Sequence, residues 1–161
     1  MVKRSLVIVF AAKFFGFFAL LYFLLVSFPP LFLQEWLAKA VSSILGLQSK
    51  GILIFVESGT FVMTESCTGL VSGIILASVV FSLRRPELKK KLLLFFAGAL
   101  LLFAVNFARL LLVVSAGVYW GIAAAGILHA ISWLAMSVAI ILVWFLLTKR
   151  FAGIGRFNEL L

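Results

Sequence analysis

The chain has 161 residues, of which 65% are hydrophobic and 12% charged, with a formal net charge of +9 at pH 7. A soluble domain of this size has too little interior to bury so much apolar surface, so we predict an integral membrane protein. The single cysteine excludes an intramolecular disulfide and any metal site built from several cysteines, and we expect no cofactor.

Four apolar runs predict an all-α membrane protein with about four transmembrane helices in a single domain, residues 1–161. The predicted spans cover residues 5–28, 67–83, 92–116 and 122–147. The first run ends at Pro29-Pro30 and is too long for the apolar core of a cleaved signal peptide, so we expect a retained helix. The short loops between the other three predict antiparallel neighbours.

The segment between the first two spans, residues 29–66, is predicted to lie outside the membrane. Polar residues recur every fourth position or so in 31–47, which indicates an amphipathic helix on the outer interface. The stretches ILIFV (52–56) and TFVMT (60–64) flank Glu57-Ser58-Gly59, which predicts a short β-hairpin with a three-residue loop. This hairpin leads the chain directly to Cys67.

The basic residues predict that both termini are cytoplasmic. Only Lys39 and Lys50 then lie outside, and Lys13 is expected to extend from its span toward the cytoplasmic face. We therefore predict a multi-pass plasma-membrane protein whose positive charge contacts anionic lipid headgroups and not nucleic acid. The ten inside residues are Lys3, Arg4, Arg84, Arg85, Lys89, Lys90, Lys91, Lys149, Arg150 and Arg156.

Three polar side chains within the spans are costly to place there: Asn106, Arg109 and His129. Asn106 and Arg109 are three residues apart and share a helix face. At a rise of about 1.5 Å per residue, Cys67, Arg109 and His129 lie about 24, 26 and 27 Å above the cytoplasmic ends of their helices. The three are thus predicted to meet at one level near the extracytoplasmic face.

These residue types suit nucleophilic catalysis. A cysteine attacks as its thiolate, which a helix N-terminus and a nearby cation both stabilise. His129 can pair with the thiolate or exchange its proton, and Arg109 can stabilise an oxyanion or hold a substrate carboxylate. Asn106 can orient Arg109 or bind substrate backbone, while Glu65 can stabilise the helix start two residues before Cys67 or, less simply, act as a base.

Other interpretations of the same residues stay open. Cys67 can be inert packing, His129 an interfacial residue, and Arg109 a structural partner of Glu57 or Glu65. A small transporter or complex subunit with Arg109 as an anion site is a further possibility. It would require polar residues through the depth of the bundle, whereas the inner halves of the spans are almost entirely apolar.

Three short motifs resemble those of the exosortase/archaeosortase family of membrane transpeptidases. Glu65-Ser66-Cys67-Thr68-Gly69 is similar to the family's E-x-C-[ST]-G segment, Asn106 and Arg109 match its N-x-x-R segment one span later, and His129 opens the next span. The resemblance covers about residues 50–147. Many bacterial members have several further N-terminal spans, so this chain is more similar to the short archaeal members.

The resemblance implies an enzyme that recognises secreted proteins by a C-terminal motif, apolar helix and basic tail. Such an enzyme cuts near the motif and passes the new C-terminus, through a thioester on Cys67, to an acceptor such as a lipid amine. The implied catalytic residues are Cys67, Arg109 and His129, supported by Asn106, Glu65 and Thr68. A membrane-surface cysteine protease that uses water as acceptor fits the same residues, and the target motif and oligomeric state are left open.

Overall fold

The computed structural model describes residues 4–152, so Lys3 and Arg156 of the orientation argument lie outside the described residues. The fold is mostly helical, as predicted, with one small sheet between the second and third helices. The helices are α1 Arg4–Ser27, α2 Leu31–Leu45, the 3₁₀ helix η1 Glu65–Thr68, α3 Leu70–Ser82 and α4 Leu88–Ala152, and the strands are β1 Gln48–Lys50, β2 Leu53–Val56 and β3 Gly59–Val62.

Two prolines separate α1 from α2, because proline lacks the N–H that a helix interior requires. The predicted amphipathic helix is confirmed as α2, which buries one face and exposes the other. It ends two residues earlier than predicted, at Leu45. The next residue, Gly46, has a left-handed φ of 67° that suits glycine, and its N–H donates to the carbonyl of Ser42.

The predicted hairpin is confirmed as the antiparallel pair β2 and β3. Its loop has two residues and not three, because Gly59 pairs with Val56 as the first residue of β3. A third strand, β1, was not predicted; it turns at Gly51, where φ is 57°, and pairs with the other side of β2. The sheet order is therefore β1-β2-β3, with β3 at one edge.

The second predicted span starts later than expected. Residues 65–68 form η1 and Gly69 adopts a left-handed φ of 79°, so the α-helix begins at Leu70 and Cys67 lies before it. The 13 residues of α3 cover only about 20 Å, less than the roughly 30 Å of a bilayer core. The prediction that Cys67 starts the α-helix was wrong, because the left-handed φ of Gly69 interrupts helical geometry between Cys67 and Leu70.

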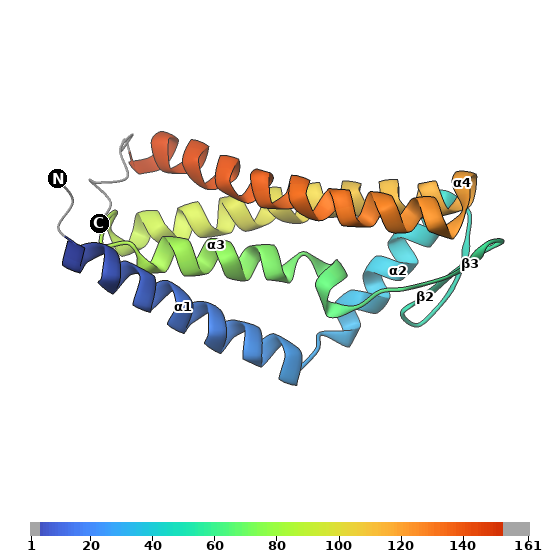
Figure 1. The fold of residues 1–161 in the computed structure, drawn as a ribbon, viewed down its shortest axis with the longest axis horizontal. Helices are drawn as coiled ribbons and strands as arrows, with labels where there is room; N and C mark the ends of the chain where they lie inside the picture. The colour runs from blue at the N-terminus through green and yellow to red at the C-terminus, as the bar shows by residue number, and fades with distance from the viewer. Residues whose placement is uncertain (1–3, 153–161) are drawn as a thin grey trace.

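The last two predicted spans are the two arms of α4. Helical geometry runs through residues 88–120, breaks at Gly121 with φ 84° and ψ 169°, and resumes over 122–152. The chain reverses there, and Figure 1 shows the two arms side by side, yellow and then orange to red. The predicted antiparallel arrangement of these two helices is confirmed. The loop expected over residues 117–121 is absent, and helical geometry is interrupted at Gly121 alone.

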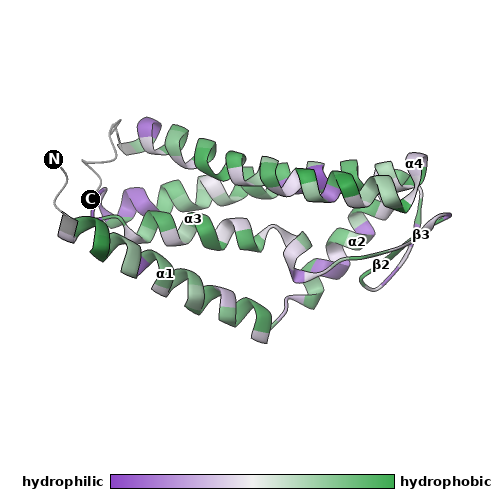
Figure 2. Ribbon diagram, in the orientation of Figure 1, coloured by the Kyte–Doolittle hydropathy of each residue, from purple (hydrophilic) through white to green (hydrophobic). Residues whose placement is uncertain are grey.

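Most of the buried apolar side chains among the described residues form two clusters. The sheet-side cluster joins α2, the sheet and the first arm of α4: Leu37, Ala38, Val41, Ile54, Met63, Cys67, Leu110 and Val114. The bundle cluster joins α3 to both arms of α4: Leu76, Val80, Leu94, Leu102, Met136 and Ile140. Figure 2 shows the long helices coloured mainly as hydrophobic, with hydrophilic segments near the ends and around the start of α3.

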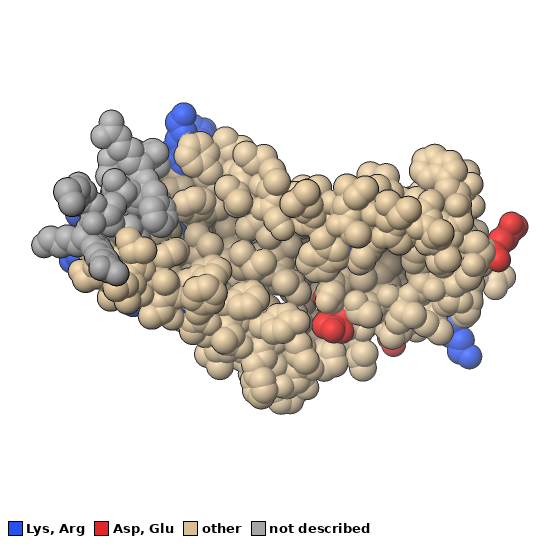
Figure 3. Space-filling view, in the orientation of Figure 1, with Lys and Arg blue, Asp and Glu red and all other residues tan. Residues whose placement is uncertain are grey.

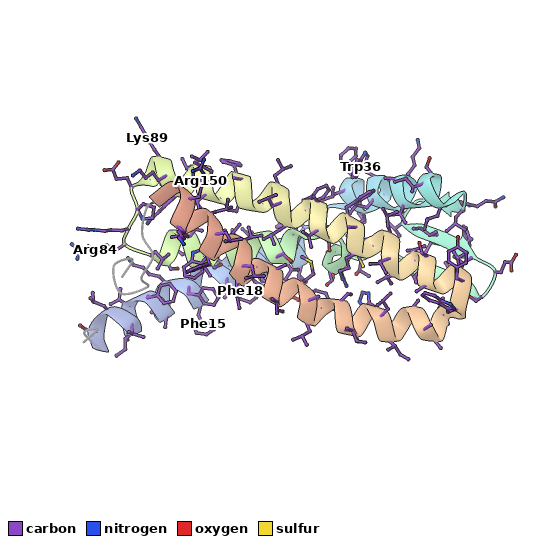
Figure 4. The ribbon with its side chains drawn as sticks, turned by 90° about the horizontal axis from the view of Figure 1, so that it is seen from above. Phe15, Phe18, Trp36, Arg84, Lys89 and Arg150 are labelled. Atoms are coloured by element: carbon purple, nitrogen blue, oxygen red, sulfur yellow. The ribbon has the colours of Figure 1, made fainter. Side chains whose placement is uncertain are left out.

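Charge is distributed unevenly along the molecule. Arg84, Lys89 and Arg150 lie at the end where α1 begins and α4 finishes (Figure 4). In Figure 3 the visible acidic side chains lie in the other half, and most visible basic ones lie at that first end. Two helical stretches, Ser5–Ser27 and Leu88–Phe151, are long and apolar enough to cross a membrane, with mean hydropathies of 2.3 and 2.4.

Candidate active site

Cys67 lies in η1, in the short connection between β3 and α3. Its N–H donates to the carbonyl of Thr64 at 2.9 Å, and its Sγ lies 3.6 Å from the Thr64 hydroxyl. The Thr68 hydroxyl donates to the carbonyl of Glu65 at 2.6 Å and accepts from the N–H of Leu70 at 3.3 Å. Thr68 therefore holds the turn that presents the thiol.

Two buried amides, one from α2 and one from α4, hold this turn. Asn106 Nδ2 donates to the carbonyl of Cys67 at 2.8 Å. The Gln34 amide, in the orientation that satisfies both neighbours, donates to the carbonyl of Met63 and accepts from the N–H of Glu65, both at 3.1 Å. A Cβ at Gly69 would lie 3.1 Å from the Asn106 amide, so glycine allows this close approach. The backbone on both sides of the thiol is thus fixed by side chains from α2 and α4.

Arg109 is almost fully buried and makes several contacts. Its Nε donates to Ser132 Oγ at 2.7 Å, and Nη1 donates to Asn106 Oδ1 at 3.2 Å. Nη2 lies 3.2 Å from His129 Nδ1, and the guanidinium lies 5.0 Å from the centre of the Trp133 ring. Asn106 and Arg109 share a helix face, as predicted, and their side chains are hydrogen bonded to each other. The contacts of Arg109 go to these four side chains and not to a carboxylate of Glu57 or Glu65.

His129 lies between two groups that can only donate hydrogen bonds. Its Nδ1 faces Arg109, and its Nε2 is 3.1 Å from Trp133 Nε1. A neutral imidazole has a single acceptor nitrogen, so it can accept from only one of the two donors at a time. One of the two donors that face the ring is therefore left without an acceptor on it.

The thiol and the imidazole share a cavity of about 220 Å³ between the sheet, η1 and both arms of α4. Within the described residues, no hydrogen bond joins Cys67 to His129. The other residues that line the cavity are almost all apolar: Phe61, Val62, Met63, Leu110, Val113, Val114, Ile122, Ala125 and Gly126. The thiol and the imidazole therefore face the same small, apolar cavity and are not hydrogen bonded to each other.

The structure brings Cys67, Asn106, Arg109 and His129 together. Thr68 and Glu65 contribute through the hydrogen bonds of the turn. Sequence analysis missed Gln34, Ser132 and Trp133. The last two lie three and four residues after His129, on the same helix face, so that spacing could have revealed them. Gln34 belongs to a different helix, and nothing local in the sequence connects it to the thiol.

The comparisons with known proteins agree with the geometry. The family model described as transmembrane exosortase (EpsH) matches residues 4–145, most of the chain. The chain belongs to the transmembrane exosortase family. The resemblance predicted from residues 50–147 is confirmed, and the match to this exosortase family extends through α1 and α2. Membership indicates a membrane protein of transpeptidase type in general terms. Comparison with curated proteins and with solved structures found no match.

Proposed function

We propose that the protein is a membrane-embedded cysteine transpeptidase. It cleaves secreted proteins at a C-terminal signal made of a short motif, an apolar helix and a basic tail, and transfers them to an amine acceptor carried by a lipid. The observation that carries this proposal is the hydrogen-bonded chain from His129 through Arg109 and Asn106 to the backbone of Cys67. Its members coincide with the three motifs that resemble the family.

The reaction proceeds in two acyl transfers. His129 first takes the proton of the Cys67 thiol. The resulting thiolate attacks the carbonyl carbon of the scissile bond, and the tetrahedral oxyanion collapses to a thioester as the C–N bond breaks. The departing amine takes a proton from His129. The acceptor amine then attacks the thioester, loses a proton to His129 and releases the thiolate. The net change is exchange of one amide bond for another, so no further reactant is needed.

Arg109 is the group best placed to stabilise the oxyanion. Its three observed hydrogen-bond contacts use one N–H on each guanidinium nitrogen, which leaves one N–H on Nη1 and one on Nη2. Arg109 contacts His129, which lines the cavity of Cys67, and itself lines a neighbouring apolar cavity of about 270 Å³. A positive charge fixed in apolar surroundings stabilises a developing anion more strongly than it would in water. Asn106 links this charge to the thiol, because the same amide contacts both Arg109 and the carbonyl of Cys67.

The proposed topology has four crossings with both termini in the cytoplasm, and the second crossing consists of η1 and α3 together. One observation supports this topology: a single end of the molecule carries the start of α1, the end of α4 and the basic residues Arg84, Lys89 and Arg150 (Figures 1 and 4). The positive-inside rule places such an end in the cytoplasm. The opposite end carries the sheet and the turn at Gly121. This orientation sets Cys67 toward the extracytoplasmic side, above the helix of a membrane-anchored substrate.

The test is co-expression with secreted reporter proteins that carry candidate C-terminal signals, followed by intact mass analysis. We expect a shortened reporter whose C-terminus carries the added mass of a lipid amine. Cys67→Ala and Cys67→Ser should abolish processing, while membrane fractionation shows that both variants still insert.

Two results would count against this proposal. Normal processing by Cys67→Ala would remove the thiol from the mechanism. A product that ends in a free carboxylate would show that water is the acceptor, and the protein would then be a membrane-surface cysteine protease without transfer.

A further inference from the structure

We propose that the free edge of β3 binds the substrate peptide as an additional strand, with the residues just before the scissile bond extended along Thr60–Val62. The inference rests on the proposed function for the identity of the peptide. It assigns a binding site to a strand that carries none of the family motifs.

The hydrogen-bond register shows which groups of β3 are free. The N–H of Met63 donates to the carbonyl of Ile52 at 2.8 Å, so this pair is hydrogen bonded. Bonded and non-bonded pairs alternate in an antiparallel ladder, so Phe61 bonds to Ile54, whereas Thr60 and Val62 direct their N–H and C=O groups away from β2. Among the described residues these four groups have no hydrogen-bond partner.

The free edge leads to the candidate active site. Phe61, Val62 and Met63 line the same cavity as Cys67 and His129. At about 220 Å³ the cavity is smaller than the roughly 300–1,000 Å³ of pockets that enclose a whole small-molecule ligand. It is large enough for one or two apolar side chains of a peptide whose backbone is held elsewhere. An unpaired edge strand beside such a cavity supplies that backbone site.

The path of the chain gives the direction of the bound peptide. The turn before β3 is fixed at the reversal of α4, where Ser58 Oγ donates to the carbonyl of Gly117 at 3.0 Å. From there the chain runs along β3 and then through Met63 toward Cys67. A substrate that enters from the extracytoplasmic side and continues into its own membrane helix runs in the same direction. It therefore pairs in parallel with β3, and its scissile carbonyl follows the paired residues at the thiol.

The test uses peptide reagents, so that it does not depend on turnover. Acetyl-Val-Ala-Ala chloromethyl ketone alkylates a cysteine when the thiolate displaces chloride. Its rate with the purified full chain is measured by intact mass and divided by the rate with chloroacetamide. Two further reagents carry an N-methyl group on one or the other of two adjacent peptide nitrogens. In a paired strand only alternate N–H groups face β3, so one methylation should slow alkylation by about tenfold and the other should have little effect.

Two proline substitutions, one on each edge strand of the sheet, serve as test variant and matched control. Val62→Pro removes an N–H from the free edge without breaking the ladder to β2, and it should lower the normalised rate by about tenfold. Ser49→Pro places the same residue on the outer edge of β1, because Ser49 also occupies a non-bonded pair, and it should keep the normalised rate. Cys67→Ala gives the background rate.

The outcomes separate this inference from the proposed function. Equal rates for all three peptide reagents with the unaltered protein would overturn strand binding even if Val62→Pro failed to fold. Equal normalised rates for Val62→Pro and the unaltered protein would also overturn it. Alternating sensitivity to N-methylation without any reporter processing would support the peptide site and count against the transpeptidase proposal alone.

Discussion

The polar side chains beside the two buried clusters differ in their hydrogen bonding. Beside the sheet-side cluster, Asn106, Arg109 and His129 are tied together and to the turn that carries Cys67. Near the bundle cluster, the buried hydroxyls of Ser82 and Thr148 have no hydrogen-bond partner in the described part of the chain. Polar atoms near the thiol are hydrogen bonded across several elements, whereas the hydroxyls of Ser82 and Thr148 belong to no such network.

This difference indicates that the two regions are held together by different interactions. The bundle cluster is held by close packing of side chains such as Leu76 against both arms of α4. The sheet-side region is held by directional contacts from α2, η1 and α4, which fix atoms at particular positions. Variants of the first region should therefore change stability, and variants of the second should change processing. Three substitutions test this separation.

The largest effect is expected from Arg109→Lys. Lysine keeps the charge but has no planar fork, so it cannot contact Ser132, Asn106 and His129 together. Reporter processing should fall by about 100-fold or more, as when a donor to an oxyanion is lost. Arg84→Lys, at the basic end, is the control and should process normally. Near-normal processing by Arg109→Lys would show that charge alone suffices.

Leu76→Ala is the counterpart in the bundle cluster. This side chain is fully buried, so its truncation leaves a cavity and should lower the free energy of unfolding by about 2–5 kcal/mol. Thermal unfolding in detergent measures the loss, and Leu146→Ala, whose side chain is 59% exposed, should show little change. Processing at low temperature should remain close to normal, and a large loss there would contradict the separation of tasks.

Gly69→Ala tests the boundary between the two regions. Gly69 and Gly46 both have left-handed φ, at 79° and 67°, so alanine at either position costs about 1–2 kcal/mol of backbone strain. Only at Gly69 would the new Cβ press on Asn106; at Gly46 it meets open space. Gly69→Ala should therefore also slow processing by about tenfold, since small displacements of reacting groups reduce catalysis. Equal processing by both variants would show that the position of Asn106 is not critical.

The sequence by itself determined the helical membrane class, the hairpin and the set of Cys67, Asn106, Arg109 and His129. The helices and the hairpin could be predicted because hydropathy and strand patterns involve residues close together in the sequence. The polar residues of the site could be predicted because a charged or polar side chain within an apolar run has a high free-energy cost in the membrane. The match of helix rises placed the thiol, guanidinium and imidazole at one level, and the structure brings them together around Asn106.

Only the tertiary structure decided how these residues are held. The turn at Gly121, the 3₁₀ helix before Leu70 and the third strand depend on single backbone angles or on pairing partners that local patterns do not specify. Gln34 reaches the turn because α2 folds back against it, and His129 faces Arg109 because the arms of α4 are antiparallel. These contacts join residues far apart in the chain, so their geometry exists only once the elements have packed.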